Sequence, residues 1–212
     1  MRSRRTSAEA YRDYFTRKVR KFGESLATLD YGSSASQRRK FGILADGIRP
    51  RRRPLTLLDL GCGFGDFLGY LRTQGREIRR YVGLDLVPDI VEVARRKHPE
   101  GRFEVRDVLR EGIAGRYDYA VANGIFYIRA PDSPDHLRRT VRTLWDHCRE
   151  GVLFNARSSY ADAAFVRRER HLYQYDPVEV LDFCLGLTRT VVLRHDYMPH
   201  EFTVYMYRDV GG

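Results

Sequence analysis

The sequence predicts an α/β protein with a doubly wound, mostly parallel sheet of seven strands. Short apolar segments alternate with segments of helical periodicity from residue 55 to residue 185, which is typical of parallel strands joined by helices on both faces of a sheet. Two apolar segments then follow each other directly over residues 188–208, and they predict an antiparallel terminal hairpin. An amphipathic segment precedes the alternating part and predicts a helical extension.

The extension contains two expected helices. Apolar residues recur at steps of three and four over residues 8–26, which predicts the first helix. The turn-rich segment LDYGSSASQ follows, and Ser34 can cap a second helix that ends near residue 48. We assign residues 1–48 to an N-terminal helical lid and residues 49–212 to a single globular domain.

The elements of that domain follow in order along the chain. Strands are expected at TLLDL (56–60), YVGLDL (81–86), RFEVRDV (102–108), YDYAVANGI (117–125), GVLFNAR (151–157), TRTVVLRHDY (188–197) and EFTVYMYR (201–208). Helices are expected at residues 64–73, 88–97, 134–148 and 177–185, with a helical patch at 160–170. Three of these helices begin at or next to a proline, which the first turn of a helix tolerates.

Composition restricts the class of protein. A chain of 212 residues that is 42% hydrophobic can bury a sizeable core. No apolar run approaches the ~20 residues that cross a bilayer, and no apolar stretch of a secretory signal follows the charged amino terminus. We therefore expect a cytoplasmic protein without a membrane partner. The three cysteines lack the paired spacing of a zinc site, so we expect no metal.

The net charge of +10 is carried almost entirely by arginine, as in proteins from GC-rich genomes. Basic clusters such as residues 49–53 and 167–170 have two interpretations. They are either solvated helix faces and caps, or a surface for an anionic substrate or RNA.

Three glycines interrupt the chain directly after the first strand of the sheet, in the pattern Asp59-x-Gly61-x-Gly63-x-Gly65. A glycine-rich turn between a strand and a helix can bind a dinucleotide. Here, however, Asp66 replaces the third glycine of that fingerprint, and a carboxylate at a helix amino end would repel a pyrophosphate. A nicotinamide or flavin dinucleotide is therefore disfavoured.

The glycine pattern resembles the first motif of the class I, Rossmann-like, S-adenosylmethionine-dependent methyltransferases. Asp85 closes the second strand 26 residues after Asp59, and Asp107 closes the third strand, as acidic residues do in that family. The resemblance covers roughly residues 55–157, and the terminal hairpin fits the family's sixth and seventh strands. It implies S-adenosylmethionine as cofactor and methyl transfer as the reaction.

The resemblance implies a role for each matching position. The main chain at Gly61, Gly63 and Gly65 lets the nucleoside approach closely. Asp85, with Leu86 beside it, accepts hydrogen bonds from both ribose hydroxyls, because a carboxylate offers two acceptor oxygens.

Five more positions complete the expected cofactor site. Asp107 accepts from the adenine amine next to the Val108 backbone, and Asp59 acts on the methionine amino group through water or backbone. Asn123, at the end of the fourth strand, lines the cleft near the methyl group. Tyr14 of the first helix stands where relatives fold a lid over the cofactor.

Methyl transfer is an in-line displacement at a carbon that the sulfonium already activates, so positioning is the enzyme's main task. A general base is needed only for a protonated nucleophile, and histidine suits that role near neutral pH. We name His195, His200 and Tyr127 as candidate catalytic residues. The alternative for the two histidines is local contacts within the hairpin. The histidines on or beside predicted helices are expected to be exposed: His98, His136 and His147.

Two further segments are candidates for ligand recognition. Arg38 or Arg39 can pair with the methionine carboxylate. The segment FNARSSYADAAFVRRERHLYQYDP (154–177), which starts with the end of the fifth strand and includes Asn155 and Arg157, is where we expect substrate selectivity.

Three functions remain open on the sequence alone. The favoured one is methyl transfer to oxygen or nitrogen of a small polar metabolite, in secondary metabolism for instance. The alternatives are an RNA or protein methyltransferase that uses the basic surface, and a non-catalytic S-adenosylmethionine-binding partner protein. The sequence does not define the oligomeric state.

Overall fold

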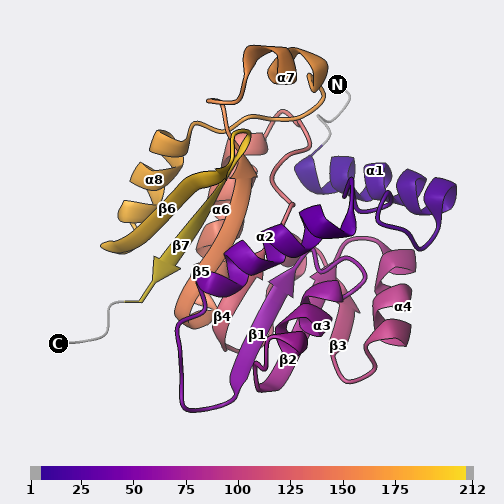
Figure 1. Ribbon diagram of the computed structural model, residues 1–212, viewed down its shortest axis with the longest axis vertical. Coiled ribbons are helices and arrows are strands. Elements are labelled where there is room, and N and C mark those ends of the chain that lie inside the picture. Colours follow the sequence, from indigo (N-terminus) through magenta and orange to yellow (C-terminus); the bar gives the residue numbers. More distant parts are fainter. Residues whose placement is uncertain (1–5, 209–212) are drawn as a thin grey trace.

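The computed structural model describes residues 6–208, and within that range seven strands form one mixed sheet in the order β3-β2-β1-β4-β5-β7-β6. The strands are β1 (Leu55–Leu60), β2 (Ile78–Asp85), β3 (Arg102–Val105), β4 (Tyr117–Ala122), β5 (Cys148–Arg157), β6 (Thr190–Met198) and β7 (Glu201–Tyr207). Strands β1 to β5 are parallel, and β7 runs antiparallel to both of its neighbours (Figure 1). The predicted fold class and terminal hairpin are confirmed.

The helices connect these strands as the periodicity predicts. They are α1 (Ser7–Phe22), α2 (Ser34–Asp46), α3 (Asp66–Thr73), α4 (Pro88–Lys97), α5 (Val108–Glu111), α6 (Ser133–Asp146), α7 (Ala163–Arg168) and α8 (Pro177–Leu185). The start of α4 at Pro88 and the end of α8 at Leu185 agree with the expected bounds. The short helix α5 was not expected, because Asp107 caps it within the segment predicted as a strand end.

Alternating side chains of β1 contact the two faces of the sheet. Leu57 packs with residues of α2, α3 and α4, whereas Leu58 packs with residues of α6 and α8. Both side chains are fully buried. Figure 1 shows the sheet between these two helical layers, with α1 and α7 beyond the carboxyl end of β1. A strand buried on both faces accounts for the nearly continuous apolar run in the sequence.

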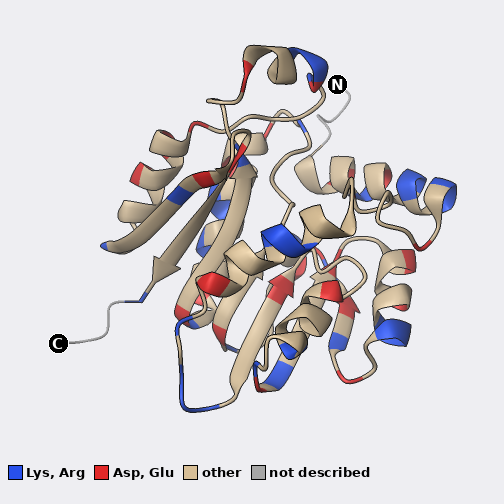
Figure 2. Cartoon of the chain, viewed as in Figure 1, with Lys and Arg blue, Asp and Glu red and all other residues tan. Residues whose placement is uncertain are grey.

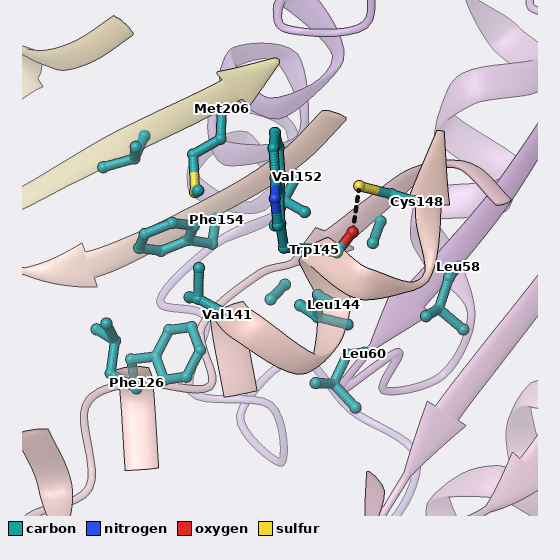
Figure 3. Packing of buried hydrophobic residues seen from close by; sticks show 14 of the residues in the cluster. Leu58, Leu60, Phe126, Val141, Leu144, Trp145, Cys148, Val152, Phe154 and Met206 are labelled. Carbon is teal, nitrogen blue, oxygen red and sulfur yellow. Dashed lines mark hydrogen bonds between the residues drawn. The ribbon is translucent and has the colours of Figure 1, made fainter. Parts of the chain in front are cut away.

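The larger core cluster centres on α6 and β5. Trp145 of α6 lies beside Val152, and the ring of Phe154 meets that of Phe126 edge to face, with 5.8 Å between centroids (Figure 3). The Cys148 thiol donates a hydrogen bond to the carbonyl of Trp145 at 3.3 Å. All three cysteines are free and buried, so they act as small core residues.

The two N-terminal helices differ in how they join this core. Phe41, Leu44 and Ile48, from α2 and the turn after it, belong to the same buried cluster as β1, so α2 is part of the main core. Helix α1 packs in smaller clusters around Tyr11 and Ile90 instead. Within the described range, no helix is both long enough and apolar enough to span a membrane.

We predict that Phe154→Ala lowers the free energy of unfolding by about 3–5 kcal/mol, because the removed ring is fully buried between α6 and the sheet. Denaturant titration measures this loss. Val192→Ala is the control: this side chain is 45% exposed on β6, and the change should stay within about 0.5 kcal/mol. Equal losses in the two variants would contradict the assigned core.

Candidate active site at the carboxyl ends of the strands

A deep cavity opens where β1, β2, β4 and β5 end, bounded by segments from α1, α2 and α6. Its space is about 1370 Å³, open solvent at the mouth included. The carboxyl edge of an open parallel sheet is the usual place for a ligand. The cavity therefore lies where this fold is expected to bind its ligands.

Gly61 forms the turn directly after β1. Its φ of +70° is in the left-handed region, which disfavours residues with a Cβ. A Cβ at this position would lie 2.1 Å from Cγ2 of Ile125, which also lines the cavity. The glycine is therefore required both by its backbone conformation and by close packing against the loop after β4.

Gly63 ties this turn to the end of β2. Its N–H donates to Oδ2 of Asp85 at 3.1 Å, and the N–H of Val87 donates to Oδ1 of the same carboxylate at 3.1 Å. Burial raises the pKa of Asp85 to about 6, although these N–H groups oppose the rise. Asp85 and Gly63 both line the cavity, and Leu86 lies beside them.

The surroundings of Gly65 and Asp66 differ from those of Gly61 and Gly63. Gly65 is outside the lining of the cavity, and a Cβ there would lie 2.9 Å from the ring of Phe103, so packing inside the protein requires this glycine. Asp66 lines the cavity. Despite its burial, the neighbouring His98 ring and the ion pair with Lys97 lower its pKa to about 2.

Asp59 is a buried carboxylate on the floor of the cavity. It accepts a hydrogen bond from the hydroxyl of Tyr81, on the neighbouring strand. Burial raises the pKa of Asp59 to about 7, and the hydrogen bond opposes the rise. Asp59 therefore changes charge near neutral pH.

Asp107 and Val108 line the cavity at the end of β3. Asp107 Oδ1 accepts from the N–H of Leu109 at 3.1 Å, so this residue also caps α5. Asp107 thus makes a local turn contact and also forms part of the cavity wall.

The first helix reaches the cavity through Tyr11, not Tyr14. The Tyr11 hydroxyl accepts hydrogen bonds from the N–H groups of Tyr127 and Ile128, and Tyr11 lines the cavity. Tyr14 lies one turn further on, packs against Phe15 and is absent from the cavity lining, which corrects the expected position.

Tyr127 lines the cavity and is held by the loop after α1. Its hydroxyl donates to Oδ2 of Asp30 at 2.9 Å, and Lys18 of α1 pairs with Oδ1 of Asp30 at 2.5 Å. Burial raises the pKa of Tyr127 well above its usual range. The phenol therefore stays protonated near neutral pH.

A polar network forms the opposite side of the cavity, at the ends of β4 and β5 and at the start of β7. Asn123 donates to the Tyr31 hydroxyl at 2.8 Å and accepts from Asn155 at 2.8 Å. Asn155 also donates to Oε1 of the buried Glu201 at 3.0 Å, and Lys40 of α2 pairs with Oε2 at 2.5 Å. All five residues line the cavity, so segments far apart in the sequence meet here.

The histidines are placed differently from the expectation. His195 and His200 are absent from the cavity lining: His195 packs near Phe202, and the ring of His200 stacks on Phe165 with 4.5 Å between centroids. Of the six histidines, all within the described residues, His136 alone lines the cavity. Burial lowers the pKa of His136, so its ring is neutral near pH 7.

Two residues of the site were missed because their helices look ordinary in sequence. His136 lies four positions before the buried Thr140 on α6, a spacing that places both on one helix face. Lys40 lines the cavity, whereas Arg38 and Arg39, the expected partners of a carboxylate, are exposed on α2. The apolar periodicity of α2, which places Phe41 and Leu44 inward, was the available sequence signal for choosing Lys40 over Arg38 and Arg39.

The charges of the cavity suit a ligand with a cation and several hydroxyl or amine donors. Asp59, Asp85 and Asp107 all lie at the ends of β1 to β3, and none of them pairs with a cationic side chain among the residues that the structure describes. Buried carboxylates without a cation are costly unless hydrogen bonds or a ligand compensate them. No group of three or more His, Cys, Asp or Glu side chains in this part of the chain could hold a metal ion.

Comparisons with known proteins agree with this geometry. The "Methyltransferase domain" family model matches residues 57–147. The protein Rv1506c of Mycobacterium tuberculosis (strain H37Rv), a candidate methyltransferase by name, is 35% identical over 156 residues, which cover 71% of this chain and 92% of that protein.

Solved structures show the same fold. The magnesium protoporphyrin IX methyltransferase of Synechocystis PCC 6803 with bound S-adenosylmethionine matches with a TM-score of 0.66 and 16% identity, over 99% of this chain and 100% of that one. A complex of DhpI with S-adenosylhomocysteine matches with a TM-score of 0.63 and 15% identity, over 95% and 96% of the two chains.

Fold, cavity and sequence relative together define a methyl-transferring enzyme. The chain belongs to the class I S-adenosylmethionine-dependent methyltransferases, and S-adenosylmethionine is its cofactor.

We predict that Gly61→Ala destabilises the protein more than Gly75→Ala does. Both glycines have a φ of +70°, so each substitution incurs about 1–2 kcal/mol of left-handed strain. Only at Gly61 does the new Cβ meet a neighbour, Ile125, whereas nothing lies within 4 Å at Gly75. Thermal and denaturant unfolding measure the difference, which we expect to be about 1–3 kcal/mol.

The double variant Gly61→Ala/Ile125→Ala tests the cause. In the Ile125→Ala background, the cost of Gly61→Ala should fall toward that of Gly75→Ala. If the cost stays the same, the steric contact between the two loops is not its source.

Proposed function

We propose that the protein transfers a methyl group from S-adenosylmethionine to an oxygen or nitrogen atom of a small polar molecule. The observation that carries this proposal is one cavity with two unlike sides. Carboxylates without cationic partners line the ends of β1 to β3, and a hydrogen-bonded network with aromatic neighbours lines the ends of β4 and β5 and the start of β7. The first side suits the donor, and the second side leaves a walled space for a small acceptor.

The residues at the ends of β1 to β3 would hold the donor. Asp85 binds the ribose hydroxyls, since its two oxygens are oriented by main-chain N–H groups and keep free lone pairs. Asp107 and Val108 bind the adenine, and Asp59 faces the cationic end of the donor. When bound, S-adenosylmethionine supplies a methyl group already activated by a sulfonium.

The chain's own task is then orientation and proton removal. Asn123, fixed between Tyr31 and Asn155, is rigid enough to position an acceptor next to the donor. His136 has a neutral ring in the cavity wall and can accept a proton from an acceptor that arrives protonated. We therefore assign this role to His136 instead of His195 and His200, because neither His195 nor His200 lines the cavity.

The distribution of charge favours a small acceptor over RNA. Figure 2 shows basic and acidic segments interspersed around the molecule. In the basic segment before β1, Arg51 pairs with Asp118 at 3.0 Å and Arg53 pairs with Glu150 at 2.9 Å. These arginines lie before the amino end of β1, away from the cavity at its carboxyl end. The two arginines therefore form structural ion pairs.

We also propose that helix α1, the first helix of the segment 1–48 assigned as a lid from sequence, acts as that lid, whereas α2 belongs to the main core. Helix α1 is fastened over the cavity by polar contacts: Ser7 donates to Asp132 at 2.8 Å, Lys18 pairs with Asp30, and Tyr11 accepts from main chain after β4. Few of its residues are buried, so it can detach without unfolding the sheet.

We predict that Asp85→Asn weakens binding of S-adenosylmethionine by about tenfold or more, because a charged acceptor for two hydroxyls is lost. Isothermal titration calorimetry measures the affinity, and circular dichroism checks the fold. Asp89→Asn is the matched control, since Asp89 is exposed on α4 just beyond this site. Unchanged affinity in a folded Asp85→Asn variant would remove its ribose role.

The affinity for S-adenosylmethionine should also depend on pH. The carboxylate of Asp85 has a pKa of about 6 and that of Asp59 of about 7, both raised by burial. Lowering the pH through these values protonates both groups and removes the negative charge that faces the donor. Asp85 alone then accounts for about tenfold weaker binding at pH 5 than at pH 7.

The stability of the unliganded protein should change with pH in the opposite direction to the affinity for S-adenosylmethionine. Because the folded-state pKa of both groups lies above the unfolded value, the free energy of unfolding falls as the pH rises from about 4 to about 7.

Calorimetry at pH 5, 6, 7 and 8 tests the effect of pH on S-adenosylmethionine binding, with Asp85→Asn as a variant that flattens the profile. A flat profile in the wild type would show that neither carboxylate titrates against the donor.

A screen for methyl transfer from labelled S-adenosylmethionine tests the function itself. Pools of small acids, alcohols and amines are compared with total RNA and with protein extract as acceptors. Label in a small molecule supports the proposal, and label only in RNA or protein would replace it with the alternative substrate class.

A further inference from the structure

Three cationic side chains with permanent charge line the cavity, and one of them has no counter-charge. Lys40 pairs with Glu201 at 2.5 Å, and Arg106 pairs with Glu104 at 3.0 Å. Arg157 lies within ion-pairing distance of no carboxylate in the described part of the chain. The cavity therefore contains one partly buried guanidinium whose charge is uncompensated.

Aromatic rings hold this guanidinium in place. Its central carbon lies 5.3 Å from the ring centroid of Phe165 and 5.9 Å from that of Tyr127. Contacts of this kind orient the planar group but leave its five N–H donors available. A fixed guanidinium with free donors matches the two oxygens of a carboxylate or phosphate.

Nearby acids do not satisfy Arg157. It is the last residue of β5 and is paired in register with Glu201 of β7. Glu201, however, is already bound by Lys40, Asn155 and Tyr197. An acid brought by a ligand is therefore the remaining partner for the guanidinium within this site.

The charge of Arg157 reaches the part of the cavity under α1. Burial raises the pKa of Tyr11, and the guanidinium of Arg157 is among the groups that oppose the rise. The rings of Tyr11 and Tyr127 meet edge to face at 5.9 Å, and both line the cavity. The guanidinium thus stands beside an aromatic wall, at the opposite end from the unpaired carboxylates of the donor side.

We propose that Arg157 binds an anionic group of the methyl acceptor, so the acceptor is a small molecule with a carboxylate or phosphate on an apolar or aromatic body. This inference rests on the proposed methyl transfer to a small molecule. Arg157 is a specificity-determining residue in it: the guanidinium fixes the acid group at the end of β5, and the rest of the acceptor lies along Tyr11 and Tyr127 toward Asn123.

Binding of three probes to the protein saturated with S-adenosylhomocysteine tests the inference. Benzoate and phenyl phosphate carry the two kinds of anion, and benzamide has nearly the shape of benzoate without the charge. Calorimetry or ligand-observed NMR gives the dissociation constants for the wild type, Arg157→Gln and Arg168→Gln. Arg168 is the matched control, because its guanidinium lies at the same 5.3 Å from Phe165 but pairs with Glu169 and is outside the cavity lining.

We expect at least one of the two anions to bind the wild type and Arg168→Gln alike, and to bind Arg157→Gln at least about tenfold more weakly. Benzamide should bind weakly to all three proteins. The anion that shows the effect identifies the acid group as carboxylate or phosphate. S-adenosylhomocysteine should bind all three proteins equally.

Other results would overturn the inference. They are equal binding of benzoate and benzamide, no binding of either anion, equal losses in the Arg157→Gln and Arg168→Gln variants, or weakened S-adenosylhomocysteine binding in Arg157→Gln, which would assign the guanidinium to the donor. Failure of the wild type to bind S-adenosylhomocysteine would instead contradict the proposed function itself.

Discussion

The site depends on the two hydrogen bonds that the Asp85 carboxylate accepts from the main chain. One comes from Gly63 in the turn after β1 and the other from Val87 at the start of α4. The first joins the turn after β1 to the end of the neighbouring parallel strand β2, and the second is local to the turn between β2 and α4. Gly61, in the same turn as Gly63, has a left-handed conformation and packs against Ile125. Because main-chain dipoles support the carboxylate, it can remain in a partly buried position without a cation, and its charge faces the ligand.

Two electrostatic environments coexist in the cavity as a result. The carboxylates at the ends of β1 to β3 come from the stretch of chain that matches the methyltransferase domain model. Lys40, Arg157 and Glu201 come from segments before and after that stretch. The proposed donor side thus lies within that stretch, whereas the proposed acceptor side combines residues within it, such as Asn123 and His136, with residues outside it.

The order of strands and helices could be predicted from sequence because each depends on local periodicity and on turn residues. Periodicity also placed the glycine motif and the three acidic positions at strand ends, whereas their assignment to the cofactor came from the resemblance to methyltransferases. Gly65 was assigned to the ligand, yet Phe103 is what requires it. His136 was missed and His195 and His200 were favoured, since periodicity does not show which helix face meets a cavity built by distant segments.

The position of β7 between β5 and β6 bears on how the protein assembles during synthesis. The ribosome makes β7 after the six other strands, so until it emerges β5 remains an unpaired edge and β6 has no partner. Glu201 begins β7 and brings the acid that neutralises Lys40. A nascent chain can therefore form the parallel part of the sheet early, while the side of the cavity that contains Glu201 is completed only when the final strand inserts.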